Sequence, residues 1–230
     1  MNHSHLQPEN PKERVLSSGE SDLPRSCAIR MAAYLVGRPN RGIVGGSTYA
    51  CTLRKAIRQV ANATSLNPVL ITGEPGLDKE NIAKLVHFGS ADRNLLLLHF
   101  DASKMHDNGN ELFGRDVVST PTMLECLGNG NLLISGIDRA EPKLKERLIS
   151  LCIHGNHSFS GRVFFTAESS VKELVEVATQ IKVPPLRVRR SDIGDWLRYY
   201  VHEYSKSQGW RKTPAVPQSA IKRLQGHHFP

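Results

Sequence analysis

The sequence predicts an α/β fold built on a parallel β-sheet, and three observations lead to this prediction. Short apolar runs alternate along the chain with segments whose apolar residues recur at helical spacing. The run at residues 95–101 (LLLLHFD) is apolar almost throughout, as expected of a strand that helices cover on both faces. The run at residues 69–72 leads through a glycine-containing turn into a helix near Lys79. Strands and helices that alternate in this way form right-handed βαβ units, which require a parallel sheet.

Each element follows from its own local pattern. Apolar runs predict strands at residues 69–72, 95–101, 131–135, 162–167 and 181–183. Amphipathic spacing and capping residues predict helices at residues 27–36, 49–63, 79–87, 141–153, 171–179, 191–207 and 218–225. In the helix at 191–207, Trp196, Tyr200 and Tyr204 recur every four residues, so we expect them to form a buried stripe.

Composition narrows the function classes. The 230 residues suffice for one domain with a small helical appendage. The net charge of +8 favours an acidic partner such as a nucleic acid, a nucleotide or an acidic protein surface. No apolar run reaches the length of about 18 residues that a membrane span needs, and the polar N-terminus resembles neither a signal peptide nor a transit peptide. We therefore expect a cytoplasmic or organelle-stromal protein with no membrane partner.

The cysteines give no sign of a covalent or metal framework. Cys27, Cys51, Cys126 and Cys152 are scattered without a C-x-x-C pair, and the ten histidines form no ligand set. We expect four buried thiols in a reducing compartment, without disulfides or a metal site.

The turn after the first strand resembles a phosphate-binding loop. The pattern G-x-x-x-x-G-K-[ST] places glycine at Gly73 and lysine at Lys79, but Asp78 replaces the second glycine and Glu80 replaces Ser or Thr. Asp78 places a carboxylate near the expected phosphates, in a conformation that glycine prefers. Charge repulsion at this distance costs about 1–4 kcal/mol, or about one to three decades of affinity. The alternative is a tight turn that binds nothing.

Several further blocks carry a family resemblance. They are GIVGGS (42–47), the segment 68–90, ELFGR (111–115), MLECLGNGNLLISGID (123–138), KLKERLISL (143–151), VPPLRVRRSDI (183–193) and AIKRLQGHHFP (220–230). In order and spacing they resemble the AAA+ domain of sigma-54-dependent transcription activators, in a degenerate form. The resemblance implies a P-loop NTPase core with a five-stranded parallel sheet and a small C-terminal helical lid. It spans roughly residues 40–230.

The resemblance also implies a binding site for ATP or ADP. Ile43 and Val44 would flank the adenine. The loop that would wrap the phosphates consists of Gly73, Glu74, Pro75, Gly76, Leu77, Asp78, Lys79 and Glu80. The family usually has Glu after the lysine, so Glu80 conforms to it. Asp78 is the main departure and Pro75 a milder one.

The groups that the family uses for hydrolysis are missing. Ser135-Gly136 stands where an acidic pair should follow the third strand, so Mg²⁺ is not expected to be well held. Asp138 lies nearby but matches a turn position. The sensor position reads Thr166-Ala167-Glu168, residues 174–180 contain no arginine finger, and the eight residues 115–122 leave no room for the sigma-contacting loop.

These observations predict a domain plan and a function. We expect a disordered or partly helical segment at 1–40, an AAA+ core at 41–190 and a truncated lid at 191–230. The first interpretation is a catalytically inactive regulatory module that binds ATP or ADP weakly and acts through a protein partner, in transcription regulation. One alternative is a divergent ATP-dependent activator domain. The other is a nucleic-acid-binding module, because residues 182–212 hold eight Lys or Arg against three Asp or Glu, interleaved with aromatics. The oligomeric state stays open.

Overall fold

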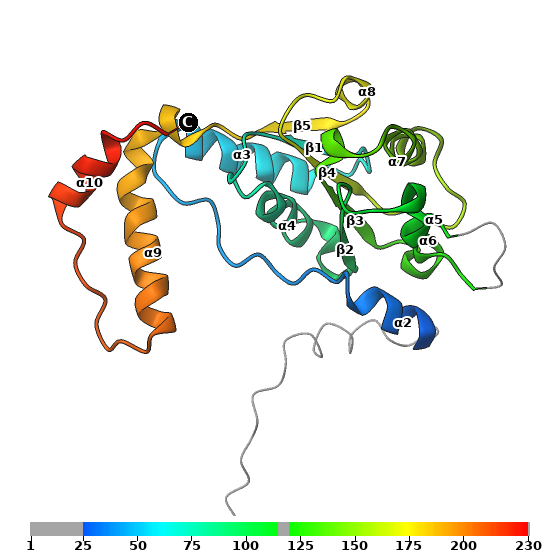
Figure 1. Ribbon diagram of the computed structural model, residues 1–230, viewed down its shortest axis with the longest axis horizontal. Coiled ribbons are helices and arrows are strands. Elements are labelled where there is room, and N and C mark those ends of the chain that lie inside the picture. Colours follow the sequence, from blue (N-terminus) through cyan, green and yellow to red (C-terminus); the bar gives the residue numbers. More distant parts are fainter. Residues whose placement is uncertain (1–24, 115–119, 230) are drawn as a thin grey trace, which may run out of the picture.

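The structure is a computed structural model that describes residues 25–114 and 120–229. At its centre is a sheet with strand order β2-β3-β4-β1-β5, in which every pairing is parallel (Figure 1). Its strands are β1 (Val69–Thr72), β2 (Leu97–Asp101), β3 (Asn131–Ser135), β4 (Val163–Ala167) and β5 (Thr179–Lys182). The predicted α/β class with a five-stranded parallel sheet is confirmed.

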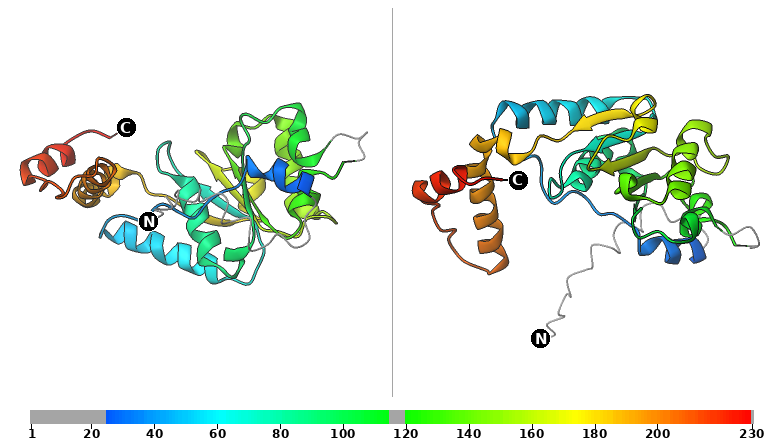
Figure 2. Two further views of the ribbon diagram at one scale, coloured as in Figure 1. Left: turned by 90° about the horizontal axis from the view of Figure 1, so that it is seen from below. Right: turned by 45° about the horizontal axis from the view of Figure 1, so that its top comes forward.

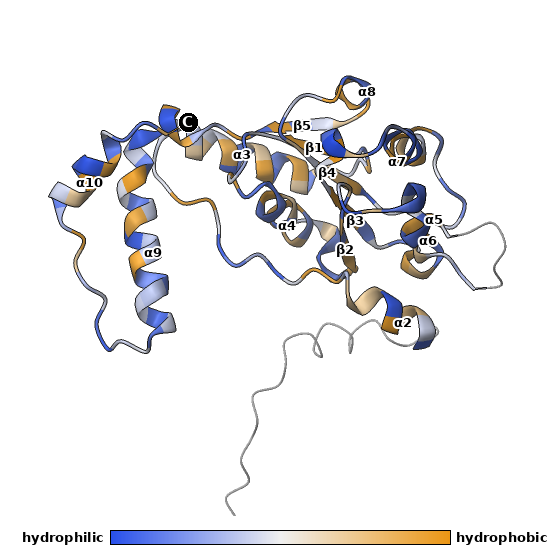
Figure 3. Ribbon diagram, in the orientation of Figure 1, coloured by the Kyte–Doolittle hydropathy of each residue, from blue (hydrophilic) through white to orange (hydrophobic). Residues whose placement is uncertain are grey.

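Helices cover both faces of this sheet (Figures 1 and 2). The α-helices of the described residues are α2 (Arg25–Ala32), α3 (Thr48–Asn62), α4 (Lys79–Gly89), α5 (Asn110–Phe113), α6 (Met123–Leu127), α7 (Pro142–His154), α8 (Lys172–Val175), α9 (Ile193–Ser207) and α10 (Gln218–Gln225), of which the last two lie off the sheet. Along β3, Leu132 and Ile134 join the core beneath α6 and α7, while Leu133 joins the core beneath α3 and α4. This double burial explains why the strands are apolar at successive positions (Figure 3).

The C-terminal helices α9 and α10 lie beside the α/β core and not on a face of its sheet (Figures 1 and 2). They pack on each other closely: a Cβ at Gly194 would lie 3.3 Å from the Ile221 side chain. Asp192, at the start of α9, is fully buried and accepts hydrogen bonds from the backbone N–H and hydroxyl of Ser47 at 2.8 and 2.6 Å. The division into a core at 41–190 and a lid at 191–230 stays a prediction.

Several predicted boundaries need correction. The helix expected at 171–179 is only the single turn α8, because Thr179 already pairs with Val69 at the start of β5. The short helices α5 and α6 were not predicted, although a capping box between Thr122 and Glu125 marks the start of α6. The helix expected at 27–36 ends at Ala32, and the chain then bridges the edge of β2. The disorder expected for the first 24 residues lies outside the described part of the chain.

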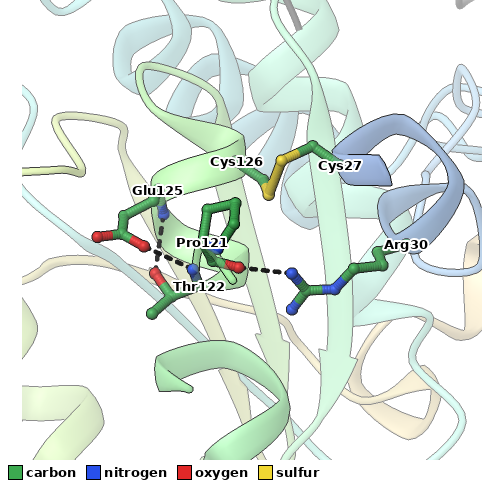
Figure 4. The surroundings of a disulfide bond; sticks show 6 residues. All are labelled: Cys27, Arg30, Pro121, Thr122, Glu125 and Cys126. Carbon is green, nitrogen blue, oxygen red and sulfur yellow. Dashed lines mark hydrogen bonds between the residues drawn. A yellow bond between two sulfur atoms is a disulfide. The ribbon is translucent and has the colours of Figure 1, made fainter. Parts of the chain in front are cut away.

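The expectation of four buried thiols is wrong. Cys27 on α2 and Cys126 on α6 form a disulfide (Figure 4). Cys51 is exposed, and burial raises the pKa of the partly buried Cys152 thiol to about 12. Sequence spacing gave no sign of the disulfide because the pair is 99 residues apart and meets only through the packing of α2 on α6.

The expected buried stripe on α9 is also wrong. Tyr200 and Tyr204 are each 58% exposed, and Trp196 is half-buried. Residues on a different side of the helix, including Gly194 and Ser205, are the buried ones. Periodicity identifies a face of a helix but does not show which face meets a neighbour.

Within the described ranges 25–114 and 120–229, no helix is long and apolar enough to cross a membrane.

Candidate functional site

A cleft of about 640 Å³ opens at the carboxyl ends of the central strands. Parallel α/β sheets bind their ligands at this edge. The cleft is lined by the loop residues Pro75, Gly76, Leu77, Asp78, Lys79 and Glu80, by Gly136, Asp138, Arg139, Thr166, Ala167 and Glu168 after β3 and β4, and by Arg41, Leu186, Arg189, Trp196 and Tyr200. The structure therefore brings the predicted phosphate loop, the altered catalytic positions and α9 together around one space.

The backbone of the predicted phosphate loop has two residues with positive φ. Gly76 has φ +77°, and Asp78 lies in the left-handed region at φ 54° and ψ 47°. The aspartate thus occupies the conformation that glycine favours, and Asp is among the side chains that tolerate it best. α4 begins at Lys79, so the N–H groups of its first turn face the loop, where the helix dipole favours anions.

The carboxylate of Asp78 is paired. Arg41 donates to it from Nη2 at 2.6 Å, and the same guanidinium lies 4.3 Å from the centre of the Trp196 ring. The negative charge that replaces glycine is therefore partly neutralised by Arg41, which also connects the loop to α9.

The lysine of the loop is turned back onto its own turn. Lys79 is only 7% exposed, and its Nζ donates to the carbonyl oxygens of Gly73 and Glu74 at 2.8 and 2.9 Å. Arg187 donates to both carboxylate oxygens of Glu74, one of them at 2.7 Å, and these hydrogen bonds hold the pKa of Glu74 below its ordinary value. A bound phosphate group would take the place of carbonyl partners at Lys79.

The positions of the expected acidic pair carry no carboxylate. Ser135 is buried and its hydroxyl lies 2.9 Å from His99 Nε2, while Gly136 has φ +67°. Burial lowers the pKa of His99, so its imidazole is neutral at pH 7. The group at the end of β3 is thus a neutral hydrogen-bonded pair in place of the expected carboxylates.

Asp138 performs a structural task. Its Oδ2 accepts hydrogen bonds from the backbone N–H groups of Glu168 and Ser169, at 2.9 and 3.2 Å, and so orders the turn after β4. This agrees with the turn position that the sequence predicted. At the sensor position, Thr166 donates from its hydroxyl to Glu80 at 3.2 Å. Across the described residues, no group of three or more His, Cys, Asp or Glu side chains is placed to hold a metal ion.

The family assignment rests on a match over most of the core. The sigma-54 interaction domain family matches residues 44–182. The chain belongs to the sigma-54 interaction domain family.

Curated relatives of this sigma-54 interaction domain are transcription regulators. Nitrogen fixation protein AnfA of Azotobacter vinelandii is 23% identical over 82% of this chain and 40% of its own length. The Nif-specific regulatory protein of Bradyrhizobium diazoefficiens is 27% identical over 82% of this chain and 37% of its own length. The chain spans about two fifths of the length of the curated relatives it matches.

Solved structures confirm the fold. NtrX of Brucella abortus in complex with ATP has a TM-score of 0.67 at 20% identity, over 80% of this chain and 46% of NtrX. The same protein in complex with ADP has a TM-score of 0.68 at 19% identity, over 88% of this chain and 50% of NtrX. These similarities and the strand order show an α/β AAA+ fold.

The space beside the predicted adenine residues is nearly filled. Ile43 and Val44 are half-buried, and Arg54 donates to the Ile43 carbonyl at 2.9 Å. The adjoining cavity, which Arg41 and Trp196 also line, measures about 10 Å³. Small-molecule sites typically measure about 300–1,000 Å³, so an adenine fits here only after side chains move. The predicted adenine pocket is therefore closed in this structure.

Three residues that line the cleft each have a buried polar atom without a hydrogen-bond partner. These atoms are Arg189 Nε, Trp196 Nε1 and Asp138 Oδ1, and within the described ranges they are all the unpartnered buried side-chain atoms. Each such atom costs about 1–3 kcal/mol. Their concentration in one cleft favours a rearrangement or a ligand that supplies partners.

The sequence did not assign Arg41, Arg189 or Trp196 to the site. The one sequence feature that could have suggested a role for Arg41 in the site is its position directly before the GIVGGS block. Trp196 was assigned to the interior of the lid helix. The structure places Arg189 next to Asp192, which lies at the start of α9.

Proposed function

We propose that this domain is a regulatory module that binds ATP or ADP weakly, does not hydrolyse it, and acts through a protein partner in transcription regulation. The observation that carries the proposal is the contrast within the cleft between a correctly shaped phosphate loop and a strand β3 that ends in Ser135 and Gly136. We also propose that residues 41–190 form the core and 191–230 the lid, and that Mg²⁺ is not held well.

The phosphate part of the proposed site comprises residues 73–80. The left-handed turn at Asp78, the N-terminus of α4 and the charge of Lys79 all favour an anion. Two features weaken binding: Lys79 must leave its two carbonyl partners, and Asp78 adds negative charge next to the phosphates. These opposing contributions lead us to expect micromolar to millimolar affinity.

Absence of hydrolysis follows from the missing groups. Phosphoryl transfer to water needs a carboxylate near the cation and another group that orients the water. Ser135 and Gly136 supply neither, and Asp138 Oδ2 is occupied by backbone N–H groups. A protein partner is proposed because the curated relatives are regulators in longer chains.

Calorimetric titration with ATP and with ADP tests binding, with Lys79→Ala as the matched variant. We expect binding that the variant lacks, together with no ATP turnover above a buffer blank. Turnover that Lys79→Ala abolishes would overturn the inactive assignment and favour a divergent ATPase. Absence of binding at millimolar nucleotide would overturn the nucleotide part of the proposal.

A second candidate function is nucleic-acid binding, and the exposure of aromatic rings on and after α9 favours it. Tyr200, Tyr204 and Trp210 are 58%, 58% and 51% exposed, in the segment 182–212 that holds eight Lys or Arg against three Asp or Glu. Exposed rings beside cations are a common platform for single-stranded nucleic acid. Salt-dependent binding of a labelled oligonucleotide, weakened by Tyr204→Ala, would support this function, and no binding at 50 mM salt would remove it.

A further inference from the structure

Trp196 lies where a ligand in the cleft can reach α9, but its ring is covered by Arg41. The Arg41 guanidinium is 4.3 Å from the centre of the Trp196 ring and 5.9 Å from that of Tyr199. Tyr200 stacks with Trp196 at 5.5 Å and an interplanar angle of 25°. Trp196 and Tyr200 both line the large cleft, so the aromatic group extends from the phosphate loop toward solvent.

Arg41 is held over Trp196 by the loop residue that departs most from the phosphate-loop pattern. Asp78 accepts from Arg41 Nη2 at 2.6 Å, so the acid that replaces glycine fixes the guanidinium over the ring. The planar guanidinium stacks on aromatic faces much as a flat ring does. Arg41 therefore occupies the ring surface that a planar ligand needs.

The charge around Arg41 favours its exchange for an anionic ligand. Arg189 is 5% exposed, its Nε has no partner, and the positive charge of Arg41 is among the causes that lower its pKa. Two guanidinium groups thus face the same cleft, Arg41 paired with Asp78 and Arg189 close to Asp192. Phosphate groups in the cleft would replace Asp78 as the partner of Arg41 and would give Arg189 Nε an acceptor.

The free volume beside Trp196 also favours this position for a planar ligand. The cavity beside Ile43 measures about 10 Å³, whereas the cleft bordered by Trp196 and Tyr200 measures about 640 Å³. A purine base on the large cleft would need only Arg41 to move.

We propose that a purine nucleotide bound in this cleft stacks its base on Trp196, in place of Arg41, and does not insert it beside Ile43 and Val44. This inference rests on the proposed nucleotide binding. In the bound state Arg41 leaves Asp78 and turns toward the phosphates, and Tyr200 supports the indole from α9. Arg41 is thus an internal substitute for the base when the cleft holds no nucleotide.

The fluorescence of Trp196 reports the base directly. The chain has two tryptophans, Trp196 and Trp210, and Trp210 is exposed at the end of the α9 loop, so Trp210→Phe leaves Trp196 as the single reporter. We expect ADP and adenosine to quench this emission in saturable titrations. Inorganic pyrophosphate, which has no base, should leave it nearly unchanged.

Matched variants locate the base by affinity. Trp196→Ala should weaken ADP binding in calorimetry roughly 5- to 150-fold, the loss that one base–aromatic stack represents. Trp196→Phe should recover most of the affinity, which separates stacking from damage to the fold. Ile43→Ala should change affinity less than about threefold, since the base does not contact it in this arrangement.

The outcomes separate this inference from the proposed function. ADP that binds in calorimetry without quenching Trp196, and more weakly after Ile43→Ala, would place the base beside Ile43 and overturn the inference while the proposed function stands. Equal ADP affinity in wild type and Trp196→Ala would overturn it too. Absence of ADP binding in calorimetry would remove the proposed function and this inference together.

Discussion

The two sides of the cleft have changed in different ways. On the phosphate-loop side, the backbone keeps its shape and charged groups persist, but each is paired within the protein: Lys79 with carbonyls, Asp78 with Arg41 and Glu74 with Arg187. On the β3–β4 side, Ser135 and Gly136 replace the expected acidic pair, and the charged groups nearby are engaged with each other or with the backbone: Arg139 pairs with Glu168, and Asp138 accepts from backbone N–H groups. The first side holds its charged groups in pairs that a ligand would have to separate, whereas the second has no carboxylate at the two positions of the expected acidic pair.

Restoring carboxylates at the end of β3 is the strongest test of this contrast. We expect Ser135→Asp with Gly136→Glu to lower the free energy of unfolding by about 3–5 kcal/mol and to produce no ATP turnover. Ser135 is 7% exposed and bonded to His99, and Gly136 has φ +67° with Arg139 3.0 Å from an added Cβ. Urea unfolding measures the effect, with Ser170→Asp on the exposed turn as control. A double variant that is as stable as the wild type and hydrolyses ATP would contradict this prediction. It would show that the end of β3 accommodates carboxylates and that only their absence prevents hydrolysis.

Removing the loop acid sharpens the comparison from the other side. We expect Asp78→Gly to bind ADP about tenfold more tightly, because it removes a negative charge near the phosphates and frees Arg41. Asp78→Asn keeps a side chain that tolerates the left-handed conformation, so it separates the effect of charge from that of the backbone. Calorimetry measures the ADP affinity of both variants, and an unchanged affinity in Asp78→Gly would contradict the prediction.

The neutral histidine of the β3 side predicts a pH dependence. The pKa of His99 is lowered by burial, so below its ordinary value of 6.5 the unfolded chain binds a proton that the folded chain does not. The free energy of unfolding should therefore fall as pH drops below about 6.5, down to the lowered folded pKa. Unfolding of wild type and His99→Gln at pH 7.5 and 5.5 measures the His99 share, since the buried His87 contributes in the same direction. If the free energy of unfolding changes equally with pH in both proteins, His99 makes no contribution to the pH dependence.

The ion pair of the phosphate-loop side predicts the smallest effect. Arg187 holds the pKa of Glu74 below its ordinary value of 4.5, so its contribution is present at neutral pH and is lost as pH falls through the lowered folded pKa. Because the pair is exposed to solvent, we expect only a slight loss of stability, and less of it at high salt. Thermal unfolding of wild type and Glu74→Gln between pH 5 and 3 tests this, and a large difference at pH 7 would contradict it.

The strands of the sheet could be predicted from the sequence because each one is marked by a short run of neighbouring residues. β1 to β4 are buried on both faces, so apolar runs identified them, whereas β5 (Thr179–Lys182) is mostly exposed and was predicted two residues late, at 181–183. The turn between β1 and α4 followed from Gly73 and Lys79. Contacts between distant segments could not be predicted. The partnership of Arg41 with Asp78 spans 37 residues, and the exposure of Tyr204 depends on which side of α9 meets α10.

The missing acids at Ser135 and Gly136 were predicted from the resemblance, and the structure adds what replaces them. His99 comes from β2, a neighbouring strand, and no sequence pattern connects it with Ser135. Likewise the pairing of Thr166 with Glu80 depends on the register between β4 and the start of α4. Side-chain partners across a sheet are decided by tertiary packing, which a local pattern does not contain.

The disulfide between Cys27 and Cys126 has a mechanical consequence. It closes a covalent ring that contains β1, β2 and the phosphate loop, whereas β3, β4, β5 and α9 lie outside the ring. A chain pulled from its two ends would extend by roughly 330 Å less when oxidised, because the 99-residue separation is bypassed by the sulfur bridge. Tension would then separate β4 and β5 from β1 but would not straighten the phosphate loop itself. Under load, the oxidation state therefore determines whether the phosphate-loop half of the cleft can be pulled straight at all.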